Sequence, residues 1–150
     1  KTLAPEDTKV EWLWHMRNQQ LDMTQGPSWE ALAPLQTPRY KTMKELVEQS
    51  HYFYEDVEPN YSELEAFRNQ ALDNALNELI IELTQLKDWN ANMINSAIKA
   101  ILQVHGLKMP QLAQPLRLLV SATLTTPSID VTLELIGRQR VLERLKRYFR

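Results

Sequence analysis

The chain has 150 residues, of which 43% are apolar and 24% are charged, and its formal net charge is −2. This composition is typical of one globular domain or two small ones, and it excludes an intrinsically disordered chain. No apolar run approaches the roughly 18 residues of a membrane-spanning helix, and without cysteine there are neither disulfides nor thiolate zinc sites.

Apolar residues recur at helical spacing along the chain, and no segment shows the alternation that is typical of a β-strand. Val10, Leu13 and Trp14 predict the apolar face of a first helix. Asp7 or Thr8 is expected to be its N-cap, because short polar side chains satisfy the first N–H groups of a helix. We therefore expect an all-α protein.

Two shorter helices are predicted in the segment "GPSWEALAPLQTPRYKTMKELVE". Ser28 is expected to open the first, and Pro34 and Pro38 are expected to end it, because proline lacks the N–H that a helix interior uses. The spacing of Thr42 and Glu45 is that of a capping box, which predicts that the second helix begins at Thr42.

The polar segment "YEDVEPNYSE" predicts a joint in the chain. After it, Ser62 is expected to cap one long helix that runs through Leu86. Its predicted buried stripe consists of Leu72, Leu76, Leu79, Ile80, Leu83 and Leu86. We expect two small helical subdomains, residues 1–57 and 58–150, that together form a helical bundle.

Four further helices are predicted in the last 63 residues of the chain, 88–150. The first lies in "DWNANMINSAIKAILQVHG" and ends at Gly106, a residue type that is common after the last turn of a helix. The others run from Pro115 to about Ala122, from Pro127, and after Gly137.

The small net charge conceals an uneven distribution of charge along the chain. Residues 55–88 hold nine acidic side chains against Arg68 and Lys87, whereas residues 138–150 hold six basic ones against Glu143. Such asymmetry hints at contact between the basic tail and a polyanion, although on charge alone a solvated terminal helix is the better explanation.

The sequence lacks the local signatures of common catalytic and metal sites. Its three glycines are isolated, which excludes a phosphate-binding loop, and no serine or cysteine lies in a recognised nucleophile motif. The three histidines are scattered, and the many carboxylates are spaced as on an exposed helix face. We expect no catalytic residue, no metal site and no cofactor in this chain.

Two segments carry residues that suit RNA. Arg39 follows a proline and precedes a helix cap, and an arginine can donate two parallel hydrogen bonds to a base or a phosphate. In "LTTPSID", Thr126 is a good N-cap and Pro127 a good first helical residue, so the next N–H groups could bind acceptors of an RNA loop. An ordinary surface arginine and an ordinary helix cap remain open as alternatives.

A longer set of motifs resembles a known family. "HYFYED", "KDWNANMINSAIKAI" and "QLAQPLRLLVSATLTTPSIDVTLELIGRQRVLERL" resemble the C-terminal anticodon-binding region of bacterial glutamyl-tRNA synthetases, and so do "WHMRNQQLDMTQGP" and "PRYKTMKELVE". The resemblance covers almost the whole chain. It implies a pair of all-α subdomains that bind the anticodon stem-loop of the glutamate tRNA.

The resemblance also implies roles for individual residues. Arg39, in "PRYKT", matches the arginine that discriminates the third anticodon base in that family. Arg117 of "PLR" and the turn residues Thr126, Pro127 and Ile129 match positions that lie against the anticodon bases.

The basic tail is expected to add weaker contacts to the RNA backbone. Its candidate residues are Arg138, Arg144 and Arg147.

Neither ATP-site motif of that family, of the H-I-G-H and K-M-S-K-S types, occurs in the sequence. The chain is therefore expected to be a C-terminal part of a cytoplasmic glutamate–tRNA ligase, whose catalytic domains use ATP and magnesium. Its expected partners are the tRNA and those catalytic domains, and we expect a monomer without a membrane partner. The alternative is a non-catalytic helical protein-interaction module, or a free-standing relative that no longer binds tRNA.

Overall fold

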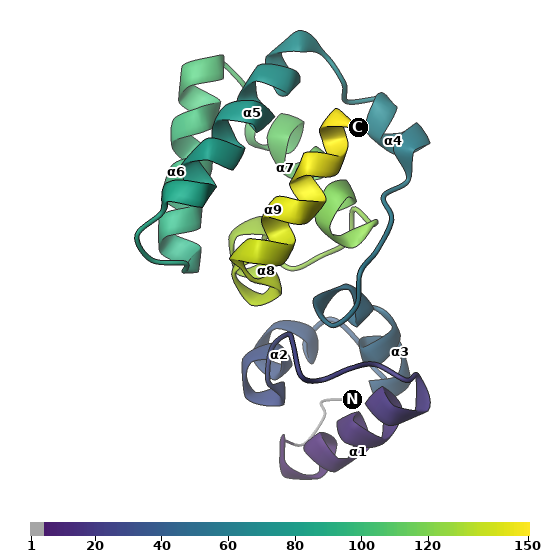
Figure 1. Cartoon of the computed structure of the whole chain (residues 1–150). Coiled ribbons are helices and arrows are strands. Elements are labelled where there is room, and N and C mark those ends of the chain that lie inside the picture. The colour runs from purple at the N-terminus through teal and green to yellow at the C-terminus, as the bar shows by residue number, and fades with distance from the viewer. Residues whose placement is uncertain (1–4) are drawn as a thin grey trace. The chain divides into compact units, whose positions relative to one another are not determined.

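The computed structural model describes residues 5–150, with the side chains described from Thr8 onward. The chain divides into two compact units, Lys1–Asp56 and Val57–Arg150, and each is described by itself. The boundary expected from the sequence lies one residue further along. Within the described residues every regular element is helical and no strand occurs, which confirms the all-α prediction (Figure 1).

The N-terminal unit consists of α1 (Pro5–Asn18), α2 (Trp29–Gln36), α3 (Met43–Glu48) and the 3-10 turn η1 (His51–Phe53). Helix α1 packs on both α2 and α3. Trp12 is the centre of the core, with ring centroids 5.4 Å from Trp29 and 6.1 Å from Tyr54. The remaining buried apolar side chains of this unit are Met16, Leu21, Leu32, Met43, Leu46, Val47, Tyr52 and Phe53.

The predicted apolar face of the first helix is largely wrong, because only Leu13 of its three residues is even half-buried. Val10 and Trp14 are 71% and 60% exposed, whereas Trp12 and Met16 are buried. The spacing of both pairs is one helical turn, so the sequence pattern cannot tell which pair packs on α2 and α3. The predicted caps are wrong as well, because α1 begins at Pro5 and Asp7 and Thr8 lie inside it.

Two predicted N-caps of this unit are confirmed. Ser28 Oγ accepts from the N–H of Ala31 at 3.2 Å, and Thr42 Oγ1 accepts from the N–H of Glu45 at 3.2 Å. Pro34, however, lies inside α2 and does not end it. The proline is exposed, and the buried residues Leu32 and Gln36 on either side keep this short helix packed through Gln36.

A close approach requires glycine at position 26. Gly26 has a φ of +102°, and a Cβ atom there would clash with the carbonyl oxygen of Phe53. The approach lets Tyr54 donate from its hydroxyl to the carbonyl of Pro27 at 2.8 Å. This contact ties the loop before α2 to the end of the unit.

The C-terminal unit contains α4 (Tyr61–Glu65), α5 (Gln70–Gln85), α6 (Ala91–His105), α7 (Met109–Ser121), α8 (Ile129–Ile136), α9 (Arg138–Lys146) and η2 (Arg147–Phe149). Figure 1 shows α5 and α6 side by side, with α9 along the bundle, and α9 packs on α5, α7 and α8. Four leucines of the predicted stripe on α5 are buried, namely Leu72, Leu76, Leu79 and Leu83, while Ile80 and Leu86 are half-buried.

The predicted single helix from Ser62 to Leu86 is wrong. Asn60 caps the short α4 by accepting from the N–H groups of Ser62 and Glu63, and Asn69 caps α5 by accepting from Leu72. Two asparagine caps nine residues apart therefore divide the segment into two helices. Each asparagine side chain accepts from backbone N–H groups that would otherwise donate within one continuous helix.

The later helices agree with prediction at their C-terminal ends more than at their starts. Gly106 ends α6 in the left-handed conformation with a φ of +65°, as predicted. Helix α7 begins at Met109 instead of Pro115, which lies buried in its middle. Pro110 occupies the first turn, where a missing N–H costs nothing, and buried leucines on both sides of Pro115 keep the helix continuous.

The C-terminal turn is held against the start of α5. The guanidinium carbon of Arg68 lies 4.2 Å from the centroid of the Tyr148 ring, and Arg68 Nη1 donates to the Tyr148 carbonyl at 3.0 Å. The Tyr148 hydroxyl donates to Asp73, and burial together with this carboxylate raises the pKa of Tyr148. No helix among residues 5–150 is long and apolar enough to span a membrane.

Candidate nucleic-acid interface

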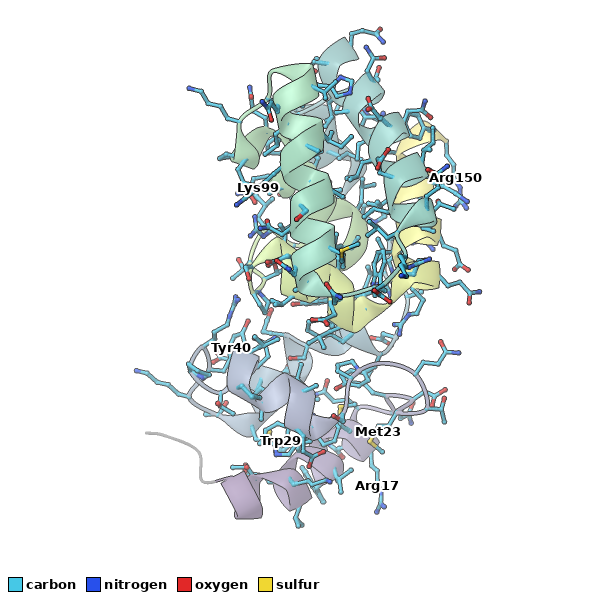
Figure 2. All side chains as sticks on the ribbon, turned by 90° about the vertical axis from the view of Figure 1, so that its left-hand side faces the viewer. Arg17, Met23, Trp29, Tyr40, Lys99 and Arg150 are labelled. Carbon is cyan, nitrogen blue, oxygen red and sulfur yellow. The ribbon has the colours of Figure 1, made fainter. Side chains whose placement is uncertain are left out.

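Arg39 lies in the connection between α2 and α3 of the N-terminal unit. Its guanidinium carbon is 5.8 Å from the centroid of the Tyr40 ring, and both side chains are half-buried. Lys41 and Lys44 follow in the same segment and are exposed. Figure 2 labels Tyr40 in this connection and the buried Trp29 at the start of α2. Arg39 therefore lies next to an aromatic ring, in a segment that carries two further exposed positive charges.

Arg117 projects from α7 in the C-terminal unit, and two polar side chains hold its guanidinium group. Its Nε donates to Thr126 Oγ1 at 2.9 Å, and its Nη1 donates to Gln114 Oε1 at 3.0 Å. An arginine held in this way loses little further side-chain entropy when a ligand binds. The structure thus brings together two of the predicted site residues, Arg117 and Thr126, with one that the prediction omitted, Gln114.

The segment Thr126–Ile129 differs from its predicted form. Helix α8 begins at Ile129 with Ser128 in the N-cap position, so Thr126 is not the cap and Pro127 is not the first helical residue. The Thr126 hydroxyl is used elsewhere, because it accepts from Arg117 and donates to the Pro127 carbonyl at 2.7 Å. The competing partner on α7 explains the shift, since a hydroxyl bound to Arg117 does not reach the first turn of α8.

The exposure of the turn residues differs as well. Pro127 is buried and Ile129 is 5% exposed, while Ser128 is exposed and Thr126 is half-buried. Thr132 Oγ1 donates to the Pro127 carbonyl at 3.1 Å and holds the turn from inside. Pro127 and Ile129 therefore support the shape of this surface more than they extend from it.

A cavity of about 330 Å³ opens between α6, α7 and the start of α8. Met109, Pro110, Ala113 and Ile129 provide its apolar lining. Its polar lining comes from Asn95, Gln114, Arg117, Ser128 and Asp130. An apolar cavity with a few convergent polar groups is the usual form of a small-molecule site, and this one lies beside Arg117.

The three arginines of the basic tail occupy different environments from those expected. Arg144 is 2% exposed and donates from Nη1 to the Val120 carbonyl at 2.5 Å, and Arg147 is 8% exposed and donates to the Val57 carbonyl. Their burial corrects the expectation of phosphate contacts from these two residues. A basic helix at a chain end resembles a solvated one in sequence, but α9 packs on α5, α7 and α8.

Arg138 is half-buried at the start of α9. Its Nη2 donates to the Leu86 carbonyl at 2.6 Å, and its guanidinium carbon lies 5.4 Å from the centroid of the Trp89 ring. These contacts satisfy a carbonyl left free at the end of α5. Arg138 therefore joins the helix ends of the bundle, and only part of its guanidinium group faces solvent.

Four polar residues that line the cavity, Asn95, Gln114, Ser128 and Asp130, were not among the predicted site residues. Gln114 immediately precedes the "PLR" motif, which could have drawn attention to it. No signal identifies Asn95, because only the packing of α6 beside α8 brings it to the cavity. Among the described residues no group of histidine, cysteine or carboxylate side chains could hold a metal ion.

Comparison with known proteins identifies similar sequences. The family model for the anticodon binding domain matches residues 8–149. A glutamate–tRNA ligase from Burkholderia cenocepacia is 40% identical over 121 residues, which cover 81% of this chain and 26% of that protein. Glutamate–tRNA ligase 1 from Coxiella burnetii is 35% identical over 147 residues, which cover 97% of this chain and 31% of that protein.

Solved structures show a similar fold. A glutamate tRNA ligase from Elizabethkingia meningosepticum aligns with a TM-score of 0.83 at 19% identity, covering 97% of this chain and 29% of that one. A glutamate–tRNA synthetase from Elizabethkingia anophelis aligns with a TM-score of 0.73 at 21% identity, covering 97% and 28%. The chain therefore spans between a quarter and a third of the length of the curated relatives and structures that it matches.

Proposed function

The chain belongs to the anticodon-binding domain family and is homologous to the anticodon-binding part of glutamate–tRNA ligases, and from this premise we propose that it recognises the anticodon stem-loop of the glutamate tRNA. The observation that carries the proposal is the Arg117–Thr126 hydrogen bond beside the cavity of the C-terminal unit. It holds a guanidinium donor at the edge of a site into which an unstacked base fits.

Base recognition is assigned to both units. Arg39 in the N-terminal unit and Arg117 in the C-terminal unit donate to base edges, while Thr126 holds Arg117 and the turn Pro127–Ile129 shapes the surface beside it. Arginine suits this role because its planar donors match the acceptors of a base. The two units then read different bases of the anticodon.

Phosphate contacts are assigned to exposed lysines in place of the buried tail arginines. Lys41 and Lys44 follow Arg39 closely in the sequence and are exposed, and so are Lys146 and Arg150 at the C-terminal end. Such contacts add affinity without sequence preference and weaken as salt rises.

The activity of a whole ligase is a further part of the proposal. In it, catalytic domains of the same protein would use ATP and magnesium to attach glutamate to the tRNA, and the anticodon contacts would favour correct docking of the distant acceptor end. We also propose that the protein is cytoplasmic and monomeric. This chain is assigned the anticodon contacts and no catalytic step.

A second candidate function rests on α1. Val10 and Trp14 are exposed and lie one helical turn apart, so they form a small apolar surface of the kind that binds another protein. This surface favours a protein-interaction module if the arginines bind no RNA.

Fluorescence anisotropy tests the proposed function directly. The chain is titrated into labelled anticodon stem-loops that carry UUC or UUG, across a series of salt concentrations. Tighter binding of the UUC loop that weakens with salt supports an autonomous anticodon reader. Equal binding of both loops reduces the chain to an unspecific clamp, and no binding at low salt favours the protein-interaction module.

A further inference from the structure

Asp130 is an unusual residue for an RNA-binding surface. It lies in the first turn of α8, is half-buried and lines the cavity between α6, α7 and α8. A carboxylate repels phosphate groups, so it weakens general RNA binding unless it accepts a hydrogen bond from the ligand. Its position in the cavity therefore indicates that a bound ligand donates a hydrogen bond to this carboxylate.

One side of the Asp130 carboxylate is already occupied. Its Oδ1 accepts from the N–H of Val131 at 2.9 Å, which limits the rotation of the group. Among the described residues no other donor reaches this carboxylate. Its second oxygen, Oδ2, is thus an acceptor that no described residue uses.

The donors of the cavity come from its other polar groups, Asn95, Gln114, Arg117 and Ser128. Gln114 Oε1 accepts from Arg117 Nη1, which fixes the orientation of the amide and leaves Gln114 Nε2 as the end that can donate. Arg117 has donors only. Asn95 makes no side-chain hydrogen bond within the described part of the chain, and its amide can donate or accept.

The cavity thus combines Asp130, which only accepts, with Arg117, which only donates, while the Asn95 amide and the Ser128 hydroxyl can do either. The Watson–Crick edge of a pyrimidine has the complementary pattern, with one N–H donor group and two acceptors, whereas guanine has two donor groups and one acceptor. A cavity of about 330 Å³ with apolar walls is also at the small end of ligand sites, which suits a single flat ring.

We propose that Asp130 is a specificity-determining residue that accepts a hydrogen bond from the N–H donor of one unstacked anticodon pyrimidine held in this cavity. Gln114 and Arg117 donate to the acceptors of the same base. This inference rests on the proposed anticodon recognition and adds to it the acidic residue that takes part in selecting one of the bases. The negative charge of Asp130 also keeps phosphate groups out of the cavity.

The variant Asp130→Asn tests the inference. Asparagine can still accept from the N–H of Val131 through its own oxygen, so the start of α8 is kept, but the side chain now carries a donor. The matched control is Glu134→Gln, which removes one negative charge one turn further along α8 and does not line the cavity. Circular dichroism melts establish that both variants fold.

The measurement is the affinity of each protein for stem-loops in which each anticodon position is changed in turn from pyrimidine to guanine. In the unmodified chain we expect discrimination of about tenfold or more at the position that enters the cavity. Asp130→Asn should reduce this ratio to about threefold or less at that position only. Glu134→Gln should keep the ratio and raise the affinity for all stem-loops to a similar extent.

Two results separate the failure of this inference from that of the proposed function. If Asp130→Asn keeps the discrimination at all three positions, or changes it no more than Glu134→Gln does, Asp130 selects no base and the inference is overturned while tRNA recognition stands. If the unmodified chain binds no stem-loop at low salt, the proposed function is overturned and this inference with it.

Discussion

Two arginines on neighbouring helices of the C-terminal unit, Arg117 on α7 and Arg144 on α9, have opposite environments. Arg117 is half-buried at the edge of a cavity, and side-chain oxygens of Gln114 and Thr126 hold it. Arg144 is almost fully buried and donates to the backbone carbonyl of Val120. The first arrangement orients a donor toward a ligand, whereas the second satisfies a backbone acceptor inside the bundle.

This comparison shows that positive charge in a sequence does not by itself mark a nucleic-acid surface. Arg144 belongs to the more basic segment of the chain, yet its guanidinium group is removed from solvent. Arg117 lies in an apolar helix. Its hydrogen bond to Thr126, nine residues further along the chain, holds its guanidinium group at the edge of the cavity. Mutations that affect stability in one case and RNA binding in the other can test this distinction.

The largest expected effect is that of Arg144→Ala. Because the variant leaves a cavity and an unsatisfied carbonyl at Val120, it should lower the free energy of unfolding by about 2–4 kcal/mol. Urea denaturation followed by circular dichroism measures the change. Lys146→Ala, an exposed neighbour on α9, is the control and should change it by less than about 0.5 kcal/mol. Equal stability of the two variants would remove the structural role assigned to Arg144.

Arg39→Gln extends the comparison to the N-terminal unit. Arg39 is half-buried on a charged surface, so the variant should remain folded and lose about 1–3 kcal/mol of discrimination at one anticodon base. Competition between stem-loops that differ at a single anticodon base measures the loss. Arg17→Gln, at an exposed position on α1, should leave the preference unchanged. An unchanged preference in Arg39→Gln would place base reading entirely in the other unit.

Thr126→Val should have a smaller effect, of about 1 kcal/mol, on binding of the cognate stem-loop. Valine has nearly the shape of threonine but cannot accept from Arg117 Nε, so the guanidinium group becomes less well oriented. Binding should therefore weaken about fivefold with little change in melting temperature. The matched variant Thr125→Val alters an exposed neighbour, and a similar loss in that variant would contradict the positioning role of Thr126.

The smallest effect per residue is expected for exposed lysines. The double variant Lys41→Ala and Lys44→Ala should weaken binding of all stem-loops alike and reduce the salt dependence of log K by about 0.7 for each lysine that binds a phosphate group. Anisotropy titrations at several salt concentrations give this slope. A double control at Lys87 and Lys99, which are exposed in the C-terminal unit, should keep the slope. Weaker binding of only one stem-loop sequence would instead indicate base contacts from Lys41 or Lys44.

Helical class and several helix ends could be predicted because they depend on neighbouring residues. Ser28 and Thr42 accept from backbone N–H groups three residues on, and Gly106 takes the left-handed conformation that ends α6. These interactions form within one or two turns, so the sequence pattern is sufficient to identify them. Arg39 is a candidate from its local context as well, whereas Arg117 is one only through the resemblance of the "PLR" motif to the family.

Predictions failed where distant residues compete for the same group. Thr126 has the sequence context of a helix cap, but Arg117 of the preceding helix takes its hydroxyl, and α8 begins three residues later at Ile129. Trp12 and Trp14 are equally apolar in sequence, and only the positions of α2 and α3 decide that Trp12 is buried and Trp14 is exposed.

The all-α class, the family and the positions of the motifs could be read from the sequence, because helix spacing, caps and short motifs are properties of local stretches of chain. Which arginines lie at the surface, and which residues line the cavity, could be known only from the folded protein. Burial and cavity shape depend on packing between helices: Asn95, Gln114 and Asp130 belong to three separate helices and meet only when α6, α7 and α8 pack together.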